Sequence, residues 1–337
     1  MIKKLALVIL FLVLATAGGA YWVYTQIENY VNSEIKPTET LLVTVPEGAN
    51  YYSFTRKLVS DGIVDASPWS RWAAKTHPEL TRLKAGTFQV QPGLTLAELF
   101  ALVRKGKEHH FSITFVEGST FKEWREQLAN TDYLTHDTTD LTEAEIAVKL
   151  GLPTEKVEGL LLPETYYYVA GQSDLSILKR AARKLQSALD EAWQGRKKDL
   201  PIKNAYELLT LASIIEKETA VDNERGKVAS VFVNRLNKGM RLQTDPTVIY
   251  GLGDKYDGNI RKKDLRTPTP YNTYVIFGLP PTPIAMPGKA SIFAAAQPAD
   301  TSYFYFVADG RGGHTFSKTL AEHNRAVRQY LKALRSQ

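Results

Sequence analysis

Apolar residues recur at helical spacing in a segment that ends at Glu218. One face of this predicted helix carries residues three, four and three positions apart: Leu208, Leu211, Ile215 and Glu218. Glu216 lies about 200° around the helix from Glu218 and points the other way. A carboxyl group that extends an apolar stripe has its charged form disfavoured and its pKa raised, which a general acid needs near neutral pH. The pattern predicts a catalytic acid at Glu218, and the alternative is a solvated glutamate in a frayed last turn.

A second pattern occurs three times before residue 130. Each copy has an extended stretch, then a glycine, then a short segment whose apolar residues follow the glycine by three, six and ten positions. The glycines are Gly48, Gly93 and Gly118, and the extended stretches cover 41–45, 86–90 and 111–116. The repeated unit is therefore predicted to be a strand, a glycine turn and a helix.

The region from Leu41 to Gln91 contains a further predicted helix near Pro68 to Thr76, followed by a second extended stretch. This order of strand, helix, helix and strand resembles a LysM module, a small fold associated with glycans that contain N-acetylglucosamine. The resemblance implies a glycan-binding region over residues 41–110.

The first residues have the pattern of a membrane anchor. Lys3 and Lys4 precede an uncharged apolar stretch from Leu5 to Val23, and Tyr21 and Trp22 close it. About twenty apolar residues span a bilayer as a helix, and aromatic residues favour the interface. Since basic residues stay on the cytoplasmic side, we expect a single-pass protein of the cytoplasmic (inner) membrane with its N-terminus inside. The rest of the chain is then in the periplasm or another extracytoplasmic space.

A cleaved signal peptide is the alternative, because Ala15-Thr16-Ala17 matches an A-x-A cleavage site. The apolar stretch continues through Ala20 to Val23, which is longer than an ordinary signal core and favours the anchor. The chain has no cysteine, which suits an oxidising compartment and excludes thiol catalysis.

Amphipathic helices are also predicted over 142–150, 175–193, 224–237 and 317–334, with a strand over 303–308. Six of the sixteen prolines lie in 268–287, which predicts a stiff irregular loop. Together these elements predict an α+β fold: an N-terminal transmembrane helix, a LysM-like strand/helix module, and a mixed α/β catalytic domain with its acid on a helix end. We expect a cytoplasmic stub and transmembrane anchor (1–25), a tether (26–40), the LysM-like region (41–110), a strand-helix connecting subdomain (111–160) and the catalytic domain (161–337).

Charge and composition argue against several classes of function. The net charge of +6 is dispersed, and its short basic clusters predict solvated faces and no nucleic-acid binding. The six histidines include no i, i+4 pair on a helix near carboxylates, so we expect surface or packing histidines and no metal site. No glycine-rich phosphate loop is present, and no cofactor is expected.

Polar and aromatic residues follow the predicted helix that ends near residue 237. Amide, hydroxyl and tyrosine groups on loops stiffened by proline suit a carbohydrate, which offers hydroxyls to bond and apolar ring faces to stack. The alternative is that these are ordinary loop residues. The candidates for a sugar-binding groove are Gln243, Thr244, Asp245, Tyr250, Asn272 and Tyr274.

The same segments resemble the endolytic murein transglycosylases of the MltG (YceG-like) family. The motifs that carry the resemblance lie in order along the chain: Glu158-Gly159-Leu160-Leu161-Leu162-Pro163-Glu164-Thr165-Tyr166, Ile214-Ile215-Glu216-Lys217-Glu218-Thr219-Ala220, Met240-Arg241-Leu242-Gln243-Thr244-Asp245-Pro246 and Pro270-Tyr271-Asn272-Thr273-Tyr274. The resemblance covers nearly the whole chain and is weakest over 130–157. The second glutamate of Glu-Lys-Glu-Thr corresponds to the family's catalytic acid, which is Glu218 here.

The resemblance implies cleavage of the β-1,4 bond between N-acetylmuramic acid and N-acetylglucosamine inside peptidoglycan strands, leaving a 1,6-anhydromuramoyl end. Ordinary glycosidases use two carboxylates. Here the sugar's own C6 hydroxyl can attack C1 within the molecule, so one carboxyl group can act first as acid and then as base. The family further implies that cleavage ends the elongation of nascent strands, and that penicillin-binding peptidoglycan synthases are partners.

Two other functions remain open. A noncatalytic peptidoglycan-binding scaffold needs only the LysM-like repeats and a tether. A glycan hydrolase needs a second carboxylate, for which Asp245 and Glu216 are the candidates.

Overall fold

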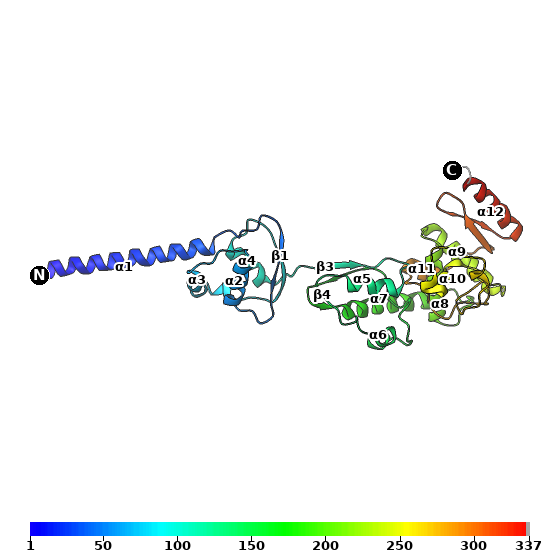
Figure 1. The fold of residues 1–337 in the computed structure, drawn as a ribbon, viewed down its shortest axis with the longest axis horizontal. Helices are drawn as coiled ribbons and strands as arrows, with labels where there is room; N and C mark the ends of the chain where they lie inside the picture. Colours follow the sequence, from blue (N-terminus) through cyan, green and yellow to red (C-terminus); the bar gives the residue numbers. More distant parts are fainter. Residues whose placement is uncertain (335–337) are drawn as a thin grey trace. The chain divides into compact units, whose positions relative to one another are not determined.

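The computed structural model describes residues 1–334, and its mixture of helices and short strands is an α+β fold (Figure 1). The chain divides into two compact units. The first contains Met1–Phe111 together with Tyr167–Gly171, and the second contains the rest of the chain.

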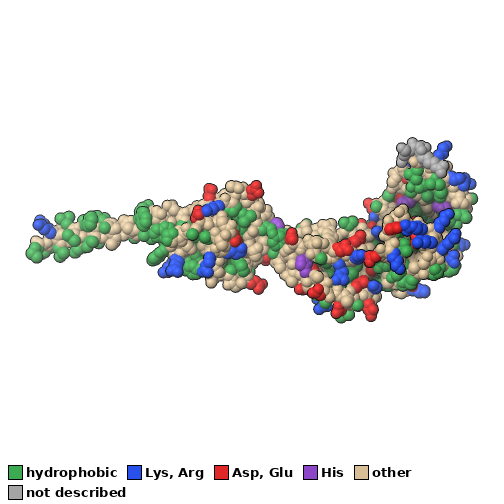
Figure 2. All heavy atoms as spheres, viewed as in Figure 1, with side chains coloured by type: hydrophobic (Ala, Val, Ile, Leu, Met, Phe, Trp, Pro, Cys, Tyr) green, Lys and Arg blue, Asp and Glu red, His purple; other side chains and the backbone are tan. Residues whose placement is uncertain are grey.

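The first unit begins with helix α1 (Ile2–Val31), which is long and apolar enough to cross a membrane. Its residues 2–22 are exposed, and they are almost all apolar. Figure 2 shows this apolar surface in green, with basic side chains at the N-terminal end. The helix fits the predicted anchor.

The end of α1 differs in character from its beginning. Ile27, Tyr30 and Val31 recur at helical spacing and are buried in the core of the first unit, where Ile35 joins them. The segment 26–40, which the sequence predicts to be a tether, therefore contains apolar side chains that pack against the folded unit.

The remainder of the first unit alternates strands and helices. Strands β1 and β2 pair antiparallel, from Leu41 opposite Val90 to Val45 opposite Gly86. Their apolar side chains pack with those of the helices in one hydrophobic core. The elements are β1 (Leu41–Val45), α2 (Tyr51–Ser60), α3 (Ser70–Thr76), the 3-10 helix η1 (Pro78–Thr81), β2 (Gly86–Val90) and α4 (Leu96–Lys105).

The three glycines of the repeated pattern lie just before helices α2, α4 and α5 (Phe121–Ala129). Gly48, Gly93 and Gly118 have φ angles of 72°, 78° and 75°, in the left-handed region that favours glycine. The following helices each begin at a capping box, with Asn50, Thr95 or Thr120 as the cap. The repeated strand, turn and helix predicted from the sequence is confirmed.

The first part of the second unit contains three helices and most of two small strand pairs, whose residues Phe111, Tyr167 and Tyr168 belong to the first unit. Strand β3 pairs with β5, and β4 pairs parallel with β6. The elements are β3 (Phe111–Thr114), α5 (Phe121–Ala129), β4 (Leu134–Thr135), α6 (Glu143–Leu150), β5 (Thr165–Tyr168), β6 (Gln172–Ser173) and α7 (Asp174–Gln194).

Helix α8 (Ala205–Glu218) lies at the centre of the second unit. Every residue from Leu208 to Ile215 is buried, because α7, α9 (Asp222–Asn237), α10 (Asp245–Leu252) and α11 (Lys289–Ala296) all contact this helix. The stripe predicted from the sequence is therefore part of a helix that is buried on all sides. Its last residue, Glu218, emerges from the core.

The other elements of the second unit surround the end of α8. They are α9 (Asp222–Asn237), α10 (Asp245–Leu252), η2 (Gly253–Lys255), η3 (Asp264–Arg266), α11 (Lys289–Ala296), the antiparallel hairpin of β7 (Tyr305–Ala308) and β8 (His314–Ser317), and α12 (Leu320–Leu334). Helix α10 falls in a segment expected to be loop. Its proline, Pro246, occupies the first turn, where a missing N–H is tolerated.

Candidate active site

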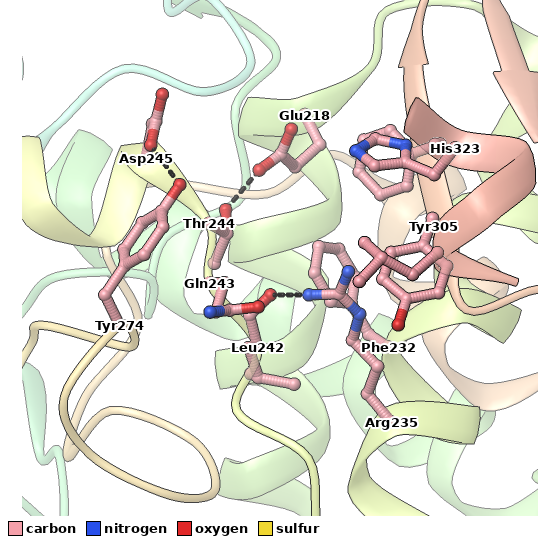
Figure 3. Close-up of a pocket in the computed structure, with 12 residues that line it drawn as sticks. Glu218, Phe232, Arg235, Leu242, Gln243, Thr244, Asp245, Tyr274, Tyr305 and His323 are labelled. Atoms are coloured by element: carbon pink, nitrogen blue, oxygen red, sulfur yellow. Dashed lines mark hydrogen bonds between the residues drawn. The ribbon is translucent and has the colours of Figure 1, made fainter. Parts of the chain in front are cut away.

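Glu218 lies at the wall of a cavity of about 370 Å³ in the second unit (Figure 3). Helices α8, α9, α10 and α12, the hairpin and two loops all contribute side chains. The cavity is lined by Glu218, Phe232, Arg235, Leu242, Gln243, Thr244, Asp245, Tyr274, Tyr305, Phe306, Leu320 and His323.

Helix α8 ends so that Glu218 faces this cavity. The next residue, Thr219, is extended, with φ −150° and ψ 132°, and its N–H still donates to the carbonyl of Ile215. The Glu218 side chain is half-buried. Burial raises the pKa of Glu218, because a carboxylate that is shielded from water loses hydration and its charged form is disfavoured.

The loop before α10 supplies the hydrogen-bond partner of Glu218. The Thr244 hydroxyl donates to Oε1 of Glu218, which favours the charged form and lowers the Glu218 pKa, against the larger effect of burial. Gln243 has φ 52°, a left-handed conformation that is uncommon for a residue with a side chain. The Thr244 N–H donates to Oγ1 of Thr273 over 3.1 Å, which fixes the loop in this conformation.

Asp245 and Tyr274 both line the cavity and form a hydrogen-bonded pair. The Tyr274 hydroxyl donates to Oδ1 of Asp245 over 2.6 Å. Burial raises the pKa of Tyr274, and the hydrogen bond to Asp245 raises it further. The negative charge of Asp245 also raises the pKa of Glu218. The pair therefore favours a protonated Glu218.

Arg235 connects three elements of the site. Its Nε donates to the carbonyl of Phe304 over 2.7 Å and its Nη1 to the carbonyl of Leu242 over 2.6 Å. Its guanidinium lies 5.2 Å from the ring centre of Tyr305. The sequence analysis did not predict Arg235 as a site residue. The sequence feature that could have indicated it is an arginine inside the apolar stripe of the predicted helix over 224–237.

The C-terminal hairpin and α12 form a wall of the cavity that the sequence did not reveal. Tyr305 and Phe306 come from β7, and Leu320 and His323 come from α12. His323 was expected to be a surface or packing residue, whereas the structure places it in the cavity lining. Glu224 of α9 holds the hairpin, with its Oε2 2.7 Å from Nδ1 of His314.

Two predicted groove residues do not line the cavity. The ring of Tyr250 lies 4.9 Å from that of Tyr271 in an edge-on contact. Asn272 is buried, and its Nδ2 donates to the carbonyls of Asp264 and Thr267 over 3.0 and 2.8 Å. Both residues hold the chain around the site.

Glu216 also lies outside the cavity lining. Its Oε2 accepts a hydrogen bond of 2.9 Å from the N–H of Gly288, at the start of α11. A carboxylate at this place interacts favourably with the end of the helix. Glu216 therefore has a structural role at the start of α11.

Comparisons with known proteins identify the family. Residues 43–329 match the YceG-like family, and the chain belongs to it. The chain is 30% identical over 345 residues to a Bacillus subtilis protein named endolytic murein transglycosylase, covering 94% of this chain and 91% of that one. A Streptococcus pneumoniae protein of the same name is 26% identical, and the alignment covers 96% of this chain but 64% of that protein.

A solved structure gives the same result. The crystal structure of a YceG-like protein from Listeria monocytogenes aligns with a TM-score of 0.53 and 27% identity, covering 86% of this chain and 99% of that one. The family resemblance predicted from the sequence is confirmed.

Proposed function

We propose that this protein is a membrane-anchored lytic transglycosylase that cleaves glycan strands of peptidoglycan internally, with Glu218 as its general acid and then its base. The observation that carries the proposal is a half-buried carboxyl group with a raised pKa at the wall of a cavity lined by hydroxyl, amide and aromatic groups. The name of the family relatives agrees with this chemistry.

The reaction needs two proton transfers, one from Glu218 and one back to it. Glu218 gives its proton to the oxygen that leaves C1 of N-acetylmuramic acid, and the bond between C1 and that oxygen breaks. The C6 hydroxyl oxygen of the same sugar then bonds to C1, and the Glu218 carboxylate takes the hydroxyl proton. The products are a 1,6-anhydromuramoyl end and a free hydroxyl on the departing N-acetylglucosamine, with Glu218 protonated again.

The neighbouring residues set the conditions for this transfer. Burial and the charge of Asp245 favour the protonated acid, and the Thr244 hydroxyl stabilises the carboxylate after the first transfer. We assign Gln243, Thr244, Asp245 and Tyr274 to sugar binding because they line the cavity. Tyr250 and Asn272 support the loops around it.

The first unit has the features expected of a glycan-binding module on an anchor. The order β1, α2, α3, β2, with its two strands antiparallel, supports a LysM-like region over 41–110. Helix α1 supports a single pass through the cytoplasmic membrane, with Lys3 and Lys4 inside. The second unit then acts outside the cytoplasm, where nascent strands and their penicillin-binding synthases are found.

The test is cleavage of purified glycan strands by the full-length protein and its variants in detergent. Glu218→Gln keeps the size of the side chain and removes the proton donor, so we expect a rate loss of roughly 10²- to 10⁴-fold. Glu216→Gln is the matched control on the same helix, and we expect it to retain production of anhydro ends. A Glu218→Gln variant that cleaves at the normal rate would reject the assignment, and strand binding without any cleavage by the unsubstituted protein would favour the scaffold.

A further inference from the structure

Helix α12 brings a histidine into the cavity that contains Glu218. His323 lies one helical turn after Leu320, and both side chains line the cavity. Figure 3 shows the imidazole pointing from α12 toward the side on which Glu218 lies. The proton transfers proposed above make no use of His323, so its presence there needs another explanation.

The imidazole is held in place by stacking. Its ring centre lies 5.2 Å from that of Tyr305, with 25° between the two planes. The guanidinium of Arg235 contacts Tyr305 in turn. Burial lowers the pKa of His323, and the positive charge of Arg235 lowers it further. The ring is therefore neutral at neutral pH and carries one N–H donor.

The surroundings of the two ring nitrogens indicate where that proton lies. Nδ1 of His323 is buried and has no hydrogen-bond partner among residues 1–334. A buried N–H without a partner is rarer in folded proteins than an unpaired acceptor. The proton is therefore favoured on Nε2, which is not enclosed in this way and belongs to the ring edge that faces the cavity.

We propose that His323 is a substrate-recognition residue that donates a hydrogen bond from Nε2 to an uncharged oxygen of the glycan bound beside Glu218. This inference rests on the proposed function, because a peptidoglycan strand offers such oxygens in its hydroxyl and N-acetyl carbonyl groups. Because the imidazole of His323 is itself fixed by stacking on Tyr305, a sugar that accepts a hydrogen bond from it is held in both position and orientation. The C-terminal hairpin and α12 thereby become part of the binding site.

Kinetics of three variants of the full-length protein test the proposal. His323→Phe keeps a flat ring on Tyr305 and removes the donor, so kcat/KM on purified strands should fall roughly tenfold, in proportion to one lost hydrogen bond. His323→Gln carries an amide N–H near the position of Nε2 and should recover most of that loss. His136→Phe, at an exposed site in the same unit, is the matched control and should behave as the unsubstituted protein.

Binding separates this inference from the proposed function. Affinity for strands is measured with Glu218→Gln and with Glu218→Gln combined with His323→Phe. A weaker double variant supports recognition by His323 even if the protein proves not to cleave. Equal binding, or an equal loss in His323→Phe and His323→Gln, overturns the proposal and leaves the role of Glu218 untouched.

A last comparison identifies the acceptor. On strands with their N-acetyl groups removed, the advantage of the unsubstituted protein over His323→Phe should vanish if the acceptor is the N-acetyl carbonyl. The advantage should persist if the acceptor is a hydroxyl. Each result supports a hydrogen bond from His323 and assigns its partner, and no advantage on either kind of strand overturns it.

Discussion

Glu158 is a buried carboxyl group that lies outside the cavity, and it should make the stability of the protein depend on pH. Only 5% of the residue is exposed. Its two carboxyl oxygens lie 3.1 and 3.3 Å from the N–H of Phe121, the first residue of α5. Burial raises the pKa of Glu158 to about 8, although the hydrogen bonds from Phe121 and Tyr250 oppose the change.

The size and sign of the effect follow from these values. The ordinary pKa of the group is 4.5, so between pH 4.5 and about 8 the folded state retains a proton that the unfolded chain has lost. The free energy of unfolding therefore falls as pH rises through this window. At about 1.4 kcal/mol for each pH unit, the full loss is at most about 5 kcal/mol. Glu158→Gln resembles the protonated form at every pH and should lack this dependence.

Urea unfolding of the full-length protein in detergent at pH 5, 7 and 9 measures the difference. We expect Glu158→Gln to gain several kcal/mol relative to the unsubstituted protein between pH 5 and pH 9. Glu155→Gln, at an exposed position of the same loop, should show no such gain. A difference between Glu158→Gln and the unsubstituted protein that stays constant with pH would refute the reasoning.

Three further substitutions test the site itself. Thr244→Val removes the hydroxyl that lowers the pKa of Glu218, so the alkaline limb of the pH–rate profile should move to higher pH. Asp245→Asn removes the charge that raises the same pKa, so that limb should move to lower pH, and shifts of the same sign in the two variants would contradict the assignment. Arg235→Met removes the donors to Phe304 and Leu242, and we expect it to destabilise the hairpin by about 2–4 kcal/mol, seen as faster hydrogen exchange in β7. Unchanged exchange in β7 would show that Arg235 does not hold the hairpin.

Local patterns were enough to predict much of the second unit. The spacing of apolar residues predicted the helix that ends at Glu218, and the predicted helices over 142–150, 175–193 and 317–334 agree with α6, α7 and α12 within three residues at each end. These elements depend on side chains a few positions apart, so the sequence carries their signal directly.

The composition of the cavity wall could not be predicted in the same way. His314 lies 90 positions from its partner Glu224, and Phe304 lies 69 positions from Arg235. Contacts at such separations depend on how the hairpin and α12 pack against α9, and one sequence has no pattern that reports this packing.

The orientation of loop side chains could not be predicted from the sequence either. Tyr250 and Asn272 have the side chains expected of a sugar-binding groove, yet both point into the protein. Residue type identified polar and aromatic candidates, whereas the fold of 241–274 decided that Thr244 and Tyr274 reach the cavity and Asn272 does not.

The most direct measurement is the mass of the products that the unsubstituted protein releases from purified glycan strands in water labelled with heavy oxygen. If the C6 hydroxyl of the same sugar attacks C1, as the mechanism with Glu218 as acid and base requires, the new ends are one water lighter than reducing ends and carry no label. Reducing ends that contain the heavy oxygen would show that water is the nucleophile, and the mechanism with a single carboxyl group would be wrong.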